Sequence, residues 1–295
     1  MMKLALITYL DKGKYASPTA ENEDDILLRF LKSKGLNIEK VIWNDQNVKW
    51  SDFEYAILKS PWDYFDLIND FNVWLNQIEV AGVKLLNPFN IVRWNSDKHY
   101  LKDIADAGLN VTPSAFLPKG ESIDLRFYFT HFNTQQLIVK PTVSGGAKNT
   151  LKITPENLAE SEQKLHNFLK DEDFIVQPFL KEIEENGEWS YLFFDGKFSH
   201  ALLKTAKPGD FRVQHTFGGT ITPKAVTLNE TQAAEQYVKQ FAQSCLYARV
   251  DGVYLNGVFH LMELELIEPF LFLETDQNSY EKYYEALSNL IGLQN

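Results

Sequence analysis

The sequence predicts an α/β protein, α+β overall, of two or three subdomains. Its 295 residues are 44% hydrophobic, which is enough to bury a substantial core. Residues 1–88 alternate apolar runs with helical patterns, as is typical of a parallel α/β unit. Further on, two alternating segments within Arg249–Phe272 flank Asn256-Gly257, a strong signal for a two-residue hairpin. A parallel first unit is therefore followed by antiparallel strands.

Composition excludes several classes of protein. The net charge of −11 argues against nucleic acid as a main partner. A single cysteine rules out an internal disulfide and fits a reducing cytosol, so we expect a cytoplasmic protein. The first apolar run is too short for a signal peptide, and no run of about 18 apolar residues exists to span a membrane. Monomer and homodimer both remain open.

The first unit is expected to be a parallel sheet with covering helices. Predicted strands and helices are, in order, Lys3–Tyr9, helix Asp24–Lys34, Ile38–Trp43, Tyr55–Lys59, helix Phe71–Ala81 and Val83–Leu86. No G-x-G-x-x-G is present, so we do not expect a dinucleotide site.

The loop SPWDY, residues 60–64, follows the third predicted strand. Ligands of open parallel sheets bind beyond the carboxyl ends of the strands. Trp62 and Asp63 are therefore candidate substrate residues. The alternative is that the aromatic residues of this loop cap a subdomain boundary.

Three carboxylates gather on the predicted hairpin. Glu263 and Glu265 are two residues apart, so they share one face of a strand, and Asp251 lies across the turn. Such an oxygen-rich group suits a hard cation such as Mg²⁺. Arg249 points the same way as Asp251. The alternative is a solvated acidic face, but the interleaved Leu and Met residues favour a buried strand, where carboxylates need partners or a metal.

The pattern R-x-D, hairpin, E-x-E and Pro269 resembles the metal-binding end of ATP-grasp ligases with a glutathione-synthetase-like ATP-binding domain. This resemblance implies that Asp251, Glu263 and Glu265 hold Mg²⁺, or alternatively Mn²⁺, and that Arg249 is catalytic. The family usually has Asn where this chain has Glu265.

Lys140 ends an apolar predicted strand in the sequence LIVKP, residues 137–141. An unpaired ammonium is costly at such a buried edge, and a phosphate would be a suitable partner. The S-G-G loop that follows is of the kind that brings backbone N–H groups onto phosphates. The resemblance extends to both features and to W-N-x-D-K and S-H-A-L-L-K. The nucleotide-phosphate contacts that it implies are Lys98, Lys140, Ser144, Gly145, Gly146 and Lys204.

The strand FIVQP is followed by Phe179 and Leu180. In the family this hinge reads adenine through main-chain groups, which the resemblance assigns to Gln177, Pro178, Phe179 and Leu180. Glu188 matches the acid that binds the ribose. Glu182, Glu184 and Glu185 precede it in a predicted loop and are alternatives for that role.

Arg212 stands in a glycine-punctuated loop and is suited to hold a carboxylate or phosphate through two hydrogen bonds. The alternative is an ordinary surface arginine. Long helices are expected at Asn229–Ala248, bearing Cys245, and at Ser279–Leu293.

The motifs run in ATP-grasp order, so the resemblance implies an ATP-grasp fold behind an N-terminal α/β domain, divided as 1–88, 89–176 and 177–295. Their wording is closest to the branch that contains the D-cycloserine-forming ligase. We therefore expect an ATP- and Mg²⁺-dependent ligase that activates a carboxylate, or a carbamoyl-type group, as an acyl phosphate for an amine. Trp62, Asp63, Arg212 and Glu268 would contact an amino-acid-like substrate. Alternatives are a nucleotide-binding module without chemistry and a phosphotransferase.

Overall fold

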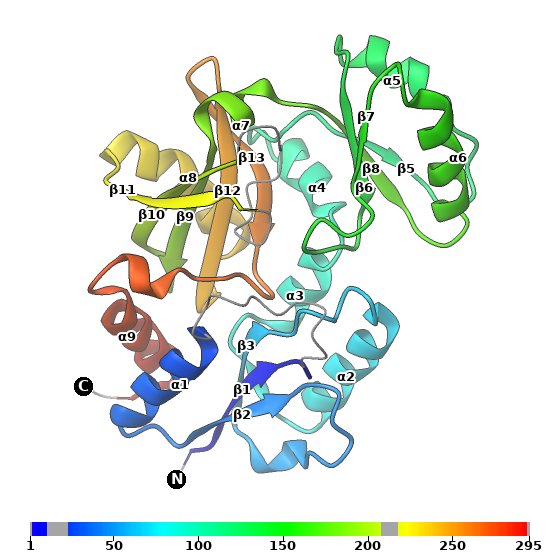
Figure 1. Ribbon diagram of the computed structural model, residues 1–295. Coiled ribbons are helices and arrows are strands. Elements are labelled where there is room, and N and C mark those ends of the chain that lie inside the picture. Colours follow the sequence, from blue (N-terminus) through cyan, green and yellow to red (C-terminus); the bar gives the residue numbers. More distant parts are fainter. Residues whose placement is uncertain (1, 11–22, 208–217, 294–295) are drawn as a thin grey trace.

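The computed structural model describes residues 2–10, 23–207 and 218–293. Within these ranges three β-sheets lie in three regions of the molecule, with helices packed around them (Figure 1). One sheet is parallel, and the other two contain the antiparallel pairs. This arrangement confirms the predicted α/β class with a parallel N-terminal unit.

The first sheet has the strand order β2-β1-β3-β4, and its strands are parallel. Its central strand β1 is buried along its whole length, as expected for an apolar run covered on both faces. The elements of this unit are β1 (Leu4–Thr8), α1 (Glu23–Ser33), β2 (Ile38–Ile42), the 3₁₀ turn η1 (Trp50–Asp52), β3 (Tyr55–Ser60), α2 (Ile68–Val80) and β4 (Lys84–Leu85).

A second sheet, in the order β5-β8-β6-β7, carries α5 and α6 on its outer side (Figure 1). Its elements are β5 (Ala115–Leu117), α5 (Leu125–His131), β6 (Leu137–Pro141), β7 (Leu151–Ile153), α6 (Leu158–Phe168) and β8 (Phe174–Pro178). The expected boundary at 176/177 falls within β8, whose Pro178 still pairs with Leu137. We therefore propose that the boundary between the second and third units follows Pro178.

The third sheet is antiparallel, in the order β11-β10-β9-β12-β13. Its elements are α7 (Lys181–Asn186), β9 (Glu188–Phe194), β10 (Lys197–Thr205), β11 (Thr220–Lys224), α8 (Leu228–Phe241), β12 (Tyr247–Leu255) and β13 (Val258–Glu265). It faces the second sheet, because Lys140 of β6 reaches Glu263 of β13 at 2.5 Å.

Two sequence-based expectations in this region were wrong. The helix predicted over 229–248 ends at Phe241, and Tyr247 already starts β12 by pairing with Phe194 of β9. Cys245 therefore lies between the two elements, buried as expected. Residues 181–186, predicted as a loop, form the helix α7.

Two short helices, α3 (Phe89–Asn95) and α4 (Tyr100–Asp106), connect the first sheet to the other two. Lys98 lies between them. Asn95 anchors α3 to the end of β13: its amide nitrogen donates to the Leu264 carbonyl at 2.7 Å, and its oxygen accepts from the Leu266 N–H at 3.1 Å. The connector formed by α3 and α4 therefore fixes Lys98 relative to β13, the strand that carries Glu263 and Glu265.

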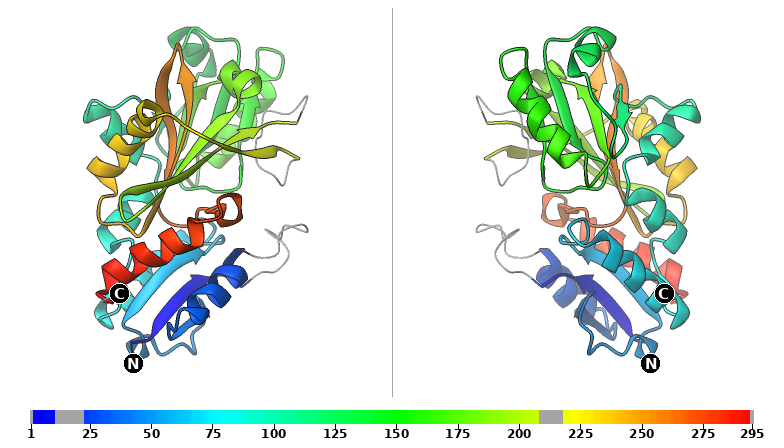
Figure 2. Two further views of the ribbon diagram at one scale, coloured as in Figure 1. Left: turned by 90° about the vertical axis from the view of Figure 1, so that its left-hand side faces the viewer. Right: turned by 90° about the vertical axis from the view of Figure 1, so that its right-hand side faces the viewer.

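The 3₁₀ turn η3 (Leu273–Thr275) leads into the last helix, α9 (Ser279–Ile291). Figure 2 shows α9, in red, between the first sheet and the upper part of the molecule. Leu287 of α9 shares one apolar core with Leu4 of β1 and Leu192 of β9. In the ranges that the structure describes, no helix is long and apolar enough to cross a membrane.

Candidate active site

The hairpin β12–β13 presents four charged side chains on one face. Asn256 and Gly257 have φ values of +51° and +80°, as a tight turn of type I′ requires, which confirms the predicted hairpin. Arg249 pairs with Glu265 across the strands, and Asp251 pairs with Glu263. Residues two apart on a strand share a face, so all four side chains point to the same side of the sheet.

Gly252 is required next to Asp251 because the strands come close there. The register of the hairpin shifts between Asp251 and Gly252. A Cβ atom on Gly252 would lie 2.3 Å from the Phe259 ring and 2.5 Å from the His260 carbonyl oxygen. Because of this bulge, Asp251 pairs with Glu263, whereas the next residue, Gly252, already pairs with Leu261.

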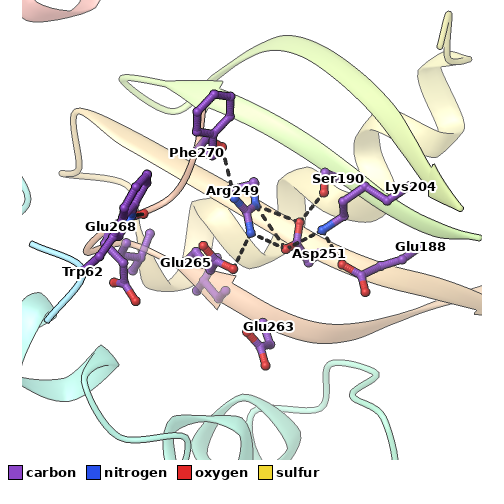
Figure 3. Close-up of polar contacts among 12 residues, drawn as sticks. Trp62, Glu188, Ser190, Lys204, Arg249, Asp251, Glu263, Glu265, Glu268 and Phe270 are labelled. Carbon is purple, nitrogen blue, oxygen red and sulfur yellow. Dashed lines mark hydrogen bonds and ion pairs between the residues drawn. The ribbon is translucent and has the colours of Figure 1, made fainter. Parts of the chain in front are cut away.

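Arg249 is the centre of the cluster (Figure 3). Its Nη2 donates to Asp251 Oδ2 at 2.8 Å and also to Glu265, and its Nε lies 3.1 Å from both Asp251 oxygens. Its Nη1 donates to the Phe270 carbonyl at 3.0 Å. Every nitrogen of the guanidinium is therefore held, and the side chain is only 8% exposed.

Lys204 of β10 completes the other side of Asp251. Its Nζ lies 3.1 Å from Asp251 Oδ2 and forms a second ion pair with Glu188 of β9 (Figure 3). Ser190, two residues after Glu188 on the same face, donates to Asp251 Oδ1 at 2.5 Å. Sequence reasoning missed Ser190, although its spacing from Glu188 was a usable signal.

Two further lysines approach from the second sheet and the connector. Lys140 pairs with Glu263, as described above. Lys98 is 7% exposed, and its Nζ donates to the Ser144 carbonyl at 2.7 Å and lies 3.2 Å from the Ser144 hydroxyl. The structure thus brings together all three predicted phosphate lysines with the predicted metal carboxylates.

The S-G-G loop packs against Phe65, which directly follows the loop of residues 60–64. A Cβ atom on Gly145 would lie 2.5 Å from the Phe65 ring, and Gly146 has a φ of +57°. Glycine is therefore needed at 145 for close packing and is favoured at 146 for its backbone conformation.

Charge is not balanced in this cluster. Burial would raise the pKa of Asp251, but Arg249 and Lys204 hold it well below its usual range. Burial acts likewise on Glu263, yet Lys140 and Lys98 lower its pKa to about 2. At Glu265, burial and the negative charges of Asp251 and Glu263 raise the pKa to about 7, because together they outweigh the lowering effect of Arg249.

Glu268 shows the same excess of negative charge. Burial, and then the charge of Glu265, raise its pKa to about 8. On the cationic side, burial and the neighbouring Lys140 lower the pKa of Lys98, although Glu263 acts in the opposite direction. Additional positive charge near Glu265 and Glu268 would therefore be stabilising.

The donor set fits a divalent cation in chemistry and charge, because Glu265 and Glu268 lack sufficient cationic partners and offer hard oxygen ligands. The arrangement does not yet match: within the described part of the chain, no three acidic, histidine or cysteine side chains converge as a metal site requires. The reason is visible in the contacts, since Arg249 and Lys204 occupy Asp251, and Lys140 occupies Glu263.

The predicted adenine segment lies at the end of β8. Gln177 is buried, and its side-chain nitrogen donates to the Ser114 hydroxyl at 2.9 Å. The Phe179 N–H donates to the Gln136 carbonyl at 2.9 Å, and Leu180 precedes α7. Lys152 lies 3.9 Å from the centre of the Phe179 ring. Pro178 has no N–H to donate and pairs with Leu137 of β6.

The predicted substrate residues lie in different surroundings. The Trp62 indole donates to the Glu268 carbonyl at 3.0 Å, so this loop does meet the acidic segment (Figure 3). Asp63 accepts from the Trp43 indole at 2.6 Å, which gives its carboxylate a structural partner. Arg212 lies outside the described residues. Sequence reasoning missed Tyr64, whose pKa is raised by burial and then by the charge of Glu268.

Comparison with known proteins identifies two regions of the chain. The ATP-grasp domain of prokaryotic glutathione synthetase matches residues 114–269, which is more than half of the chain. The N-terminal domain of the D-cycloserine synthetase DcsG matches residues 4–87. The first match covers the hairpin β12–β13 with Lys140 and Lys204, and the second covers the parallel sheet, whereas Lys98 lies between the two matched ranges.

Two curated relatives agree with this. The cycloserine biosynthesis protein DcsG of Streptomyces lavendulae is 26% identical over 282 residues, which cover 89% of this chain and 91% of the relative. The glutathione synthetase of Nitrosomonas europaea is 23% identical over 231 residues, 76% of this chain and 67% of the relative.

Solved structures extend the similarity to the fold. The crystal structure of D-cycloserine synthetase DcsG superposes with a TM-score of 0.85 at 24% identity and covers 97% of this chain and 98% of its own. D-alanine–D-alanine ligase from Bacillus anthracis, solved in complex with ATP, gives a TM-score of 0.69 at 15% identity, with coverage of 98% and 97%.

Proposed function

This chain belongs to the ATP-grasp family, and we propose that it uses ATP to join the carboxylate of an amino-acid-like small molecule to an amine. It is an ATP-grasp ligase of the carboxylate–amine type.

Three lysines from three parts of the fold carry the proposal: two pair with the hairpin carboxylates, and the charge of the third acts on Glu263. Lys98 comes from the connector, Lys140 from the second sheet and Lys204 from the third. Lys98 and Lys204 are buried and the Lys140 side chain is only 13% exposed, and lysines in such surroundings need anionic partners. Lys140 and Lys204 now contact protein carboxylates and Lys98 contacts Ser144, and nucleotide phosphates are strong charged acceptors for all three. We assign these three lysines to the phosphates of ATP, with Ser144, Gly145 and Gly146 covering them.

Binding of the nucleotide would release the carboxylates for a cation. Asp251, Glu263 and Glu265 would hold Mg²⁺ once Lys140 and Lys204 turn to phosphate. When bound, Mg²⁺ neutralises charge on the transferring phosphate. Gln177, Pro178, Phe179 and Leu180 would surround the adenine. Glu188 would bind the ribose once its ion pair with Lys204 is broken.

The substrate end lies beside Trp62 and Glu268. With a pKa of about 8, Glu268 is largely protonated at neutral pH, and an ammonium group next to it would restore its charge. Glu268 is therefore better suited to an ammonium group than Asp63, which already holds the Trp43 indole. Arg212 would bind the carboxylate.

In the reaction, the substrate carboxylate attacks the γ-phosphate of ATP and releases ADP. The amine then attacks the carbonyl carbon of the acyl phosphate, and the negative charge of the tetrahedral intermediate develops on the former carboxylate oxygen. Collapse of this intermediate breaks the bond to the phosphate, releases inorganic phosphate and, with loss of a proton from the nitrogen, gives the amide. We assign Arg249 to stabilise that charge, and this assignment is supported by its burial and by the one orientation in which Asp251, Glu265 and the Phe270 carbonyl hold it.

ADP release should be measured against a panel of amino acids, hydroxamates and amines, offered singly and in pairs. We expect release only when both a carboxylate and an amine are present, in one molecule or two, with an amide-type product. A phosphorylated product formed without an amine would identify a phosphotransferase. Tight ATP binding with no turnover across the panel would identify a nucleotide-binding module instead.

A further inference from the structure

We propose that Glu23, paired with Lys59 in the first unit, is a positioning residue for Arg249. Glu23 holds the backbone segment 270–273, and that segment in turn holds the guanidinium. The proposal rests on the catalytic role assigned to Arg249 above. It adds a residue from the opposite end of the chain to the machinery of the reaction.

Glu23 is a fixed buried carboxylate. It starts α1, is 3% exposed, and its Oε1 lies 2.8 Å from the Nζ of Lys59, which is 1% exposed. Asp24 lies 3.3 Å from the same ammonium. Burial alone would lower the pKa of Lys59, but the charges of Glu23 and Asp24 outweigh it and raise the pKa. Lys59 therefore remains charged and keeps Glu23 in place.

The two oxygens of Glu23 each bind a different backbone N–H of the segment. Oε1 accepts from Leu271 at 2.9 Å, and Oε2 accepts from Leu273 at 3.0 Å. Phe272 lies between them with a φ of +51°, a conformation that residues with a side chain rarely adopt. A bidentate carboxylate thus holds the one strained residue of this segment from both sides.

The same segment contacts Arg249 twice. The Phe270 carbonyl accepts from Arg249 Nη1 at 3.0 Å, the contact drawn in Figure 3. The Phe272 ring centre lies 5.7 Å from the Arg249 guanidinium carbon. The Phe270 carbonyl and the Leu271 N–H belong to one planar peptide unit, so the hydrogen bond from Leu271 to Glu23 also sets the direction of the carbonyl that Arg249 contacts. The backbone at Phe272 sets the position of its ring.

The two phenyl rings link the two cations directly. Phe270 lies with its ring centre 5.7 Å from Lys59 Nζ, and its centre is 4.9 Å from that of Phe272 in an edge-to-face contact. Lys59, Phe270, Phe272 and Arg249 thus form a continuous series of cation–ring and ring–ring contacts. A change at Glu23 would reach the guanidinium through both the backbone and the rings.

Precise orientation matters for a group that stabilises developing charge, and small misplacements lower the rate steeply. Asp251 and Glu265 fix Nε and Nη2 of Arg249, whereas Nη1 depends on Phe270. The competing interpretation is that Glu23 only anchors α1 to segment 270–273. In that case its loss would lower stability without changing Arg249.

The first test observes Arg249 directly and needs no substrate. In ¹⁵N-labelled protein, the Nε–H signals of the five arginines are recorded, and that of Arg249 is identified by its loss in Arg249→Lys. Glu23→Gln replaces one acceptor oxygen by an amide donor that faces a backbone N–H. We expect the Arg249 signal to shift or broaden in this variant.

The matched control is Asp25→Asn, which removes an exposed ion pair with Lys40 in the same turn of α1. It should leave the Arg249 signal unchanged. If Glu23→Gln does not fold, Glu23→Asp is used, since it keeps the charge opposite Lys59 but is too short to reach both N–H groups. An unchanged Arg249 signal in a folded Glu23 variant overturns the proposal.

The second test is turnover per folded molecule with the substrate found by the ADP-release panel. We expect kcat of Glu23→Gln to fall about tenfold with the KM for ATP within about twofold of wild type. A shifted signal with unchanged kcat also overturns the positioning role. Wild-type protein that turns over no member of the panel contradicts the proposed function alone, because the Arg249 signal still decides whether Glu23 orients it.

Discussion

Lys59 and Arg249 are both nearly inaccessible to water, yet their surroundings differ in how well charge is satisfied. The acids beside Lys59 have fixed protein partners: Glu23 binds two backbone N–H groups, and Asp24 accepts from the Ser60 hydroxyl. Around Arg249, by contrast, Glu265 and Glu268 have pKa values raised to about 7 and about 8.

This difference separates two uses of buried charge. A satisfied cluster fixes geometry, because any rearrangement leaves a buried charge without a partner. A cluster with surplus negative charge is instead prepared to exchange partners with a ligand that brings cations and phosphates. Burial alone would not have distinguished the two, since Lys59 is the more deeply buried of the two cations.

The largest expected effect is that of Arg249→Ala. Turnover should fall by about 10²–10³, as is usual when a donor to a developing oxyanion is removed, while ATP binding is kept. Arg93→Ala is the matched control, because it removes an exposed arginine ion pair with Glu79. A lower melting temperature with near-normal turnover of the folded enzyme would make Arg249 a structural residue, as Lys59 is.

The next largest effect concerns the lysines that exchange partners. Lys140→Ala and Lys204→Ala should each weaken ATP binding about 10–100-fold, the range expected for a lost hydrogen bond between charged groups. Lys239→Ala serves as control because its pair with Glu235 is exposed. Titration calorimetry measures all three. Unchanged affinity in both the Lys140 and the Lys204 variant would remove the phosphate assignment.

A smaller effect should appear in the pH dependence of Mg²⁺ binding. Below pH 7 Glu265 is largely protonated, so a cation must displace a proton before binding. Affinity for Mg²⁺ in the presence of a non-hydrolysable ATP analogue should therefore rise about tenfold between pH 6 and pH 8. Glu265→Gln should flatten this rise. A pH-independent affinity in the wild type would exclude Glu265 as a ligand.

The smallest effect is expected at His200, whose ring nitrogens both have hydrogen-bond partners. His200 is buried, with one ring nitrogen 3.0 Å from the Leu271 carbonyl and the other 2.9 Å from the Ser199 hydroxyl. Burial lowers its pKa in the folded state, so the unfolded chain binds the proton more readily. Stability should be constant above about pH 7 and decrease, on the order of 1 kcal/mol or less, as pH falls below about 6.5.

His200→Gln keeps a donor for the Leu271 carbonyl but cannot titrate. Thermal unfolding of this variant should lose that part of the pH dependence between pH 7 and pH 5. If the two proteins respond identically to pH, another group is responsible.

Local patterns predicted the hairpin and its charged face well. Asn256-Gly257 fixes the turn, and spacing by two places Arg249 with Asp251 and Glu263 with Glu265. The helix over 229–248 was predicted too long because its apolar spacing continues past Phe241. Pairing of Tyr247 with β9 overrides that local preference, and pairing of this kind is not visible in a short window.

The partners of the charged residues could not be predicted, because they are distant in the sequence. Lys140 and Glu263 are 123 positions apart, and Glu23 meets Leu273 across 250. A lysine at a strand end shows that a partner is needed but not which one. The assignments of individual residues to ATP, Mg²⁺ and substrate accordingly remain predictions, as do the oligomeric state and the cytoplasmic location.

The position of α9 has a consequence for folding during synthesis. Leu4 and Leu31 of the first unit bury their side chains in a core that includes Tyr283 and Leu287 of α9. A nascent chain that has not yet reached residue 279 therefore exposes one apolar side of a unit whose strands were translated long before. Such surfaces promote aggregation, so production of this protein in cells should depend on chaperones that bind the chain until α9 emerges.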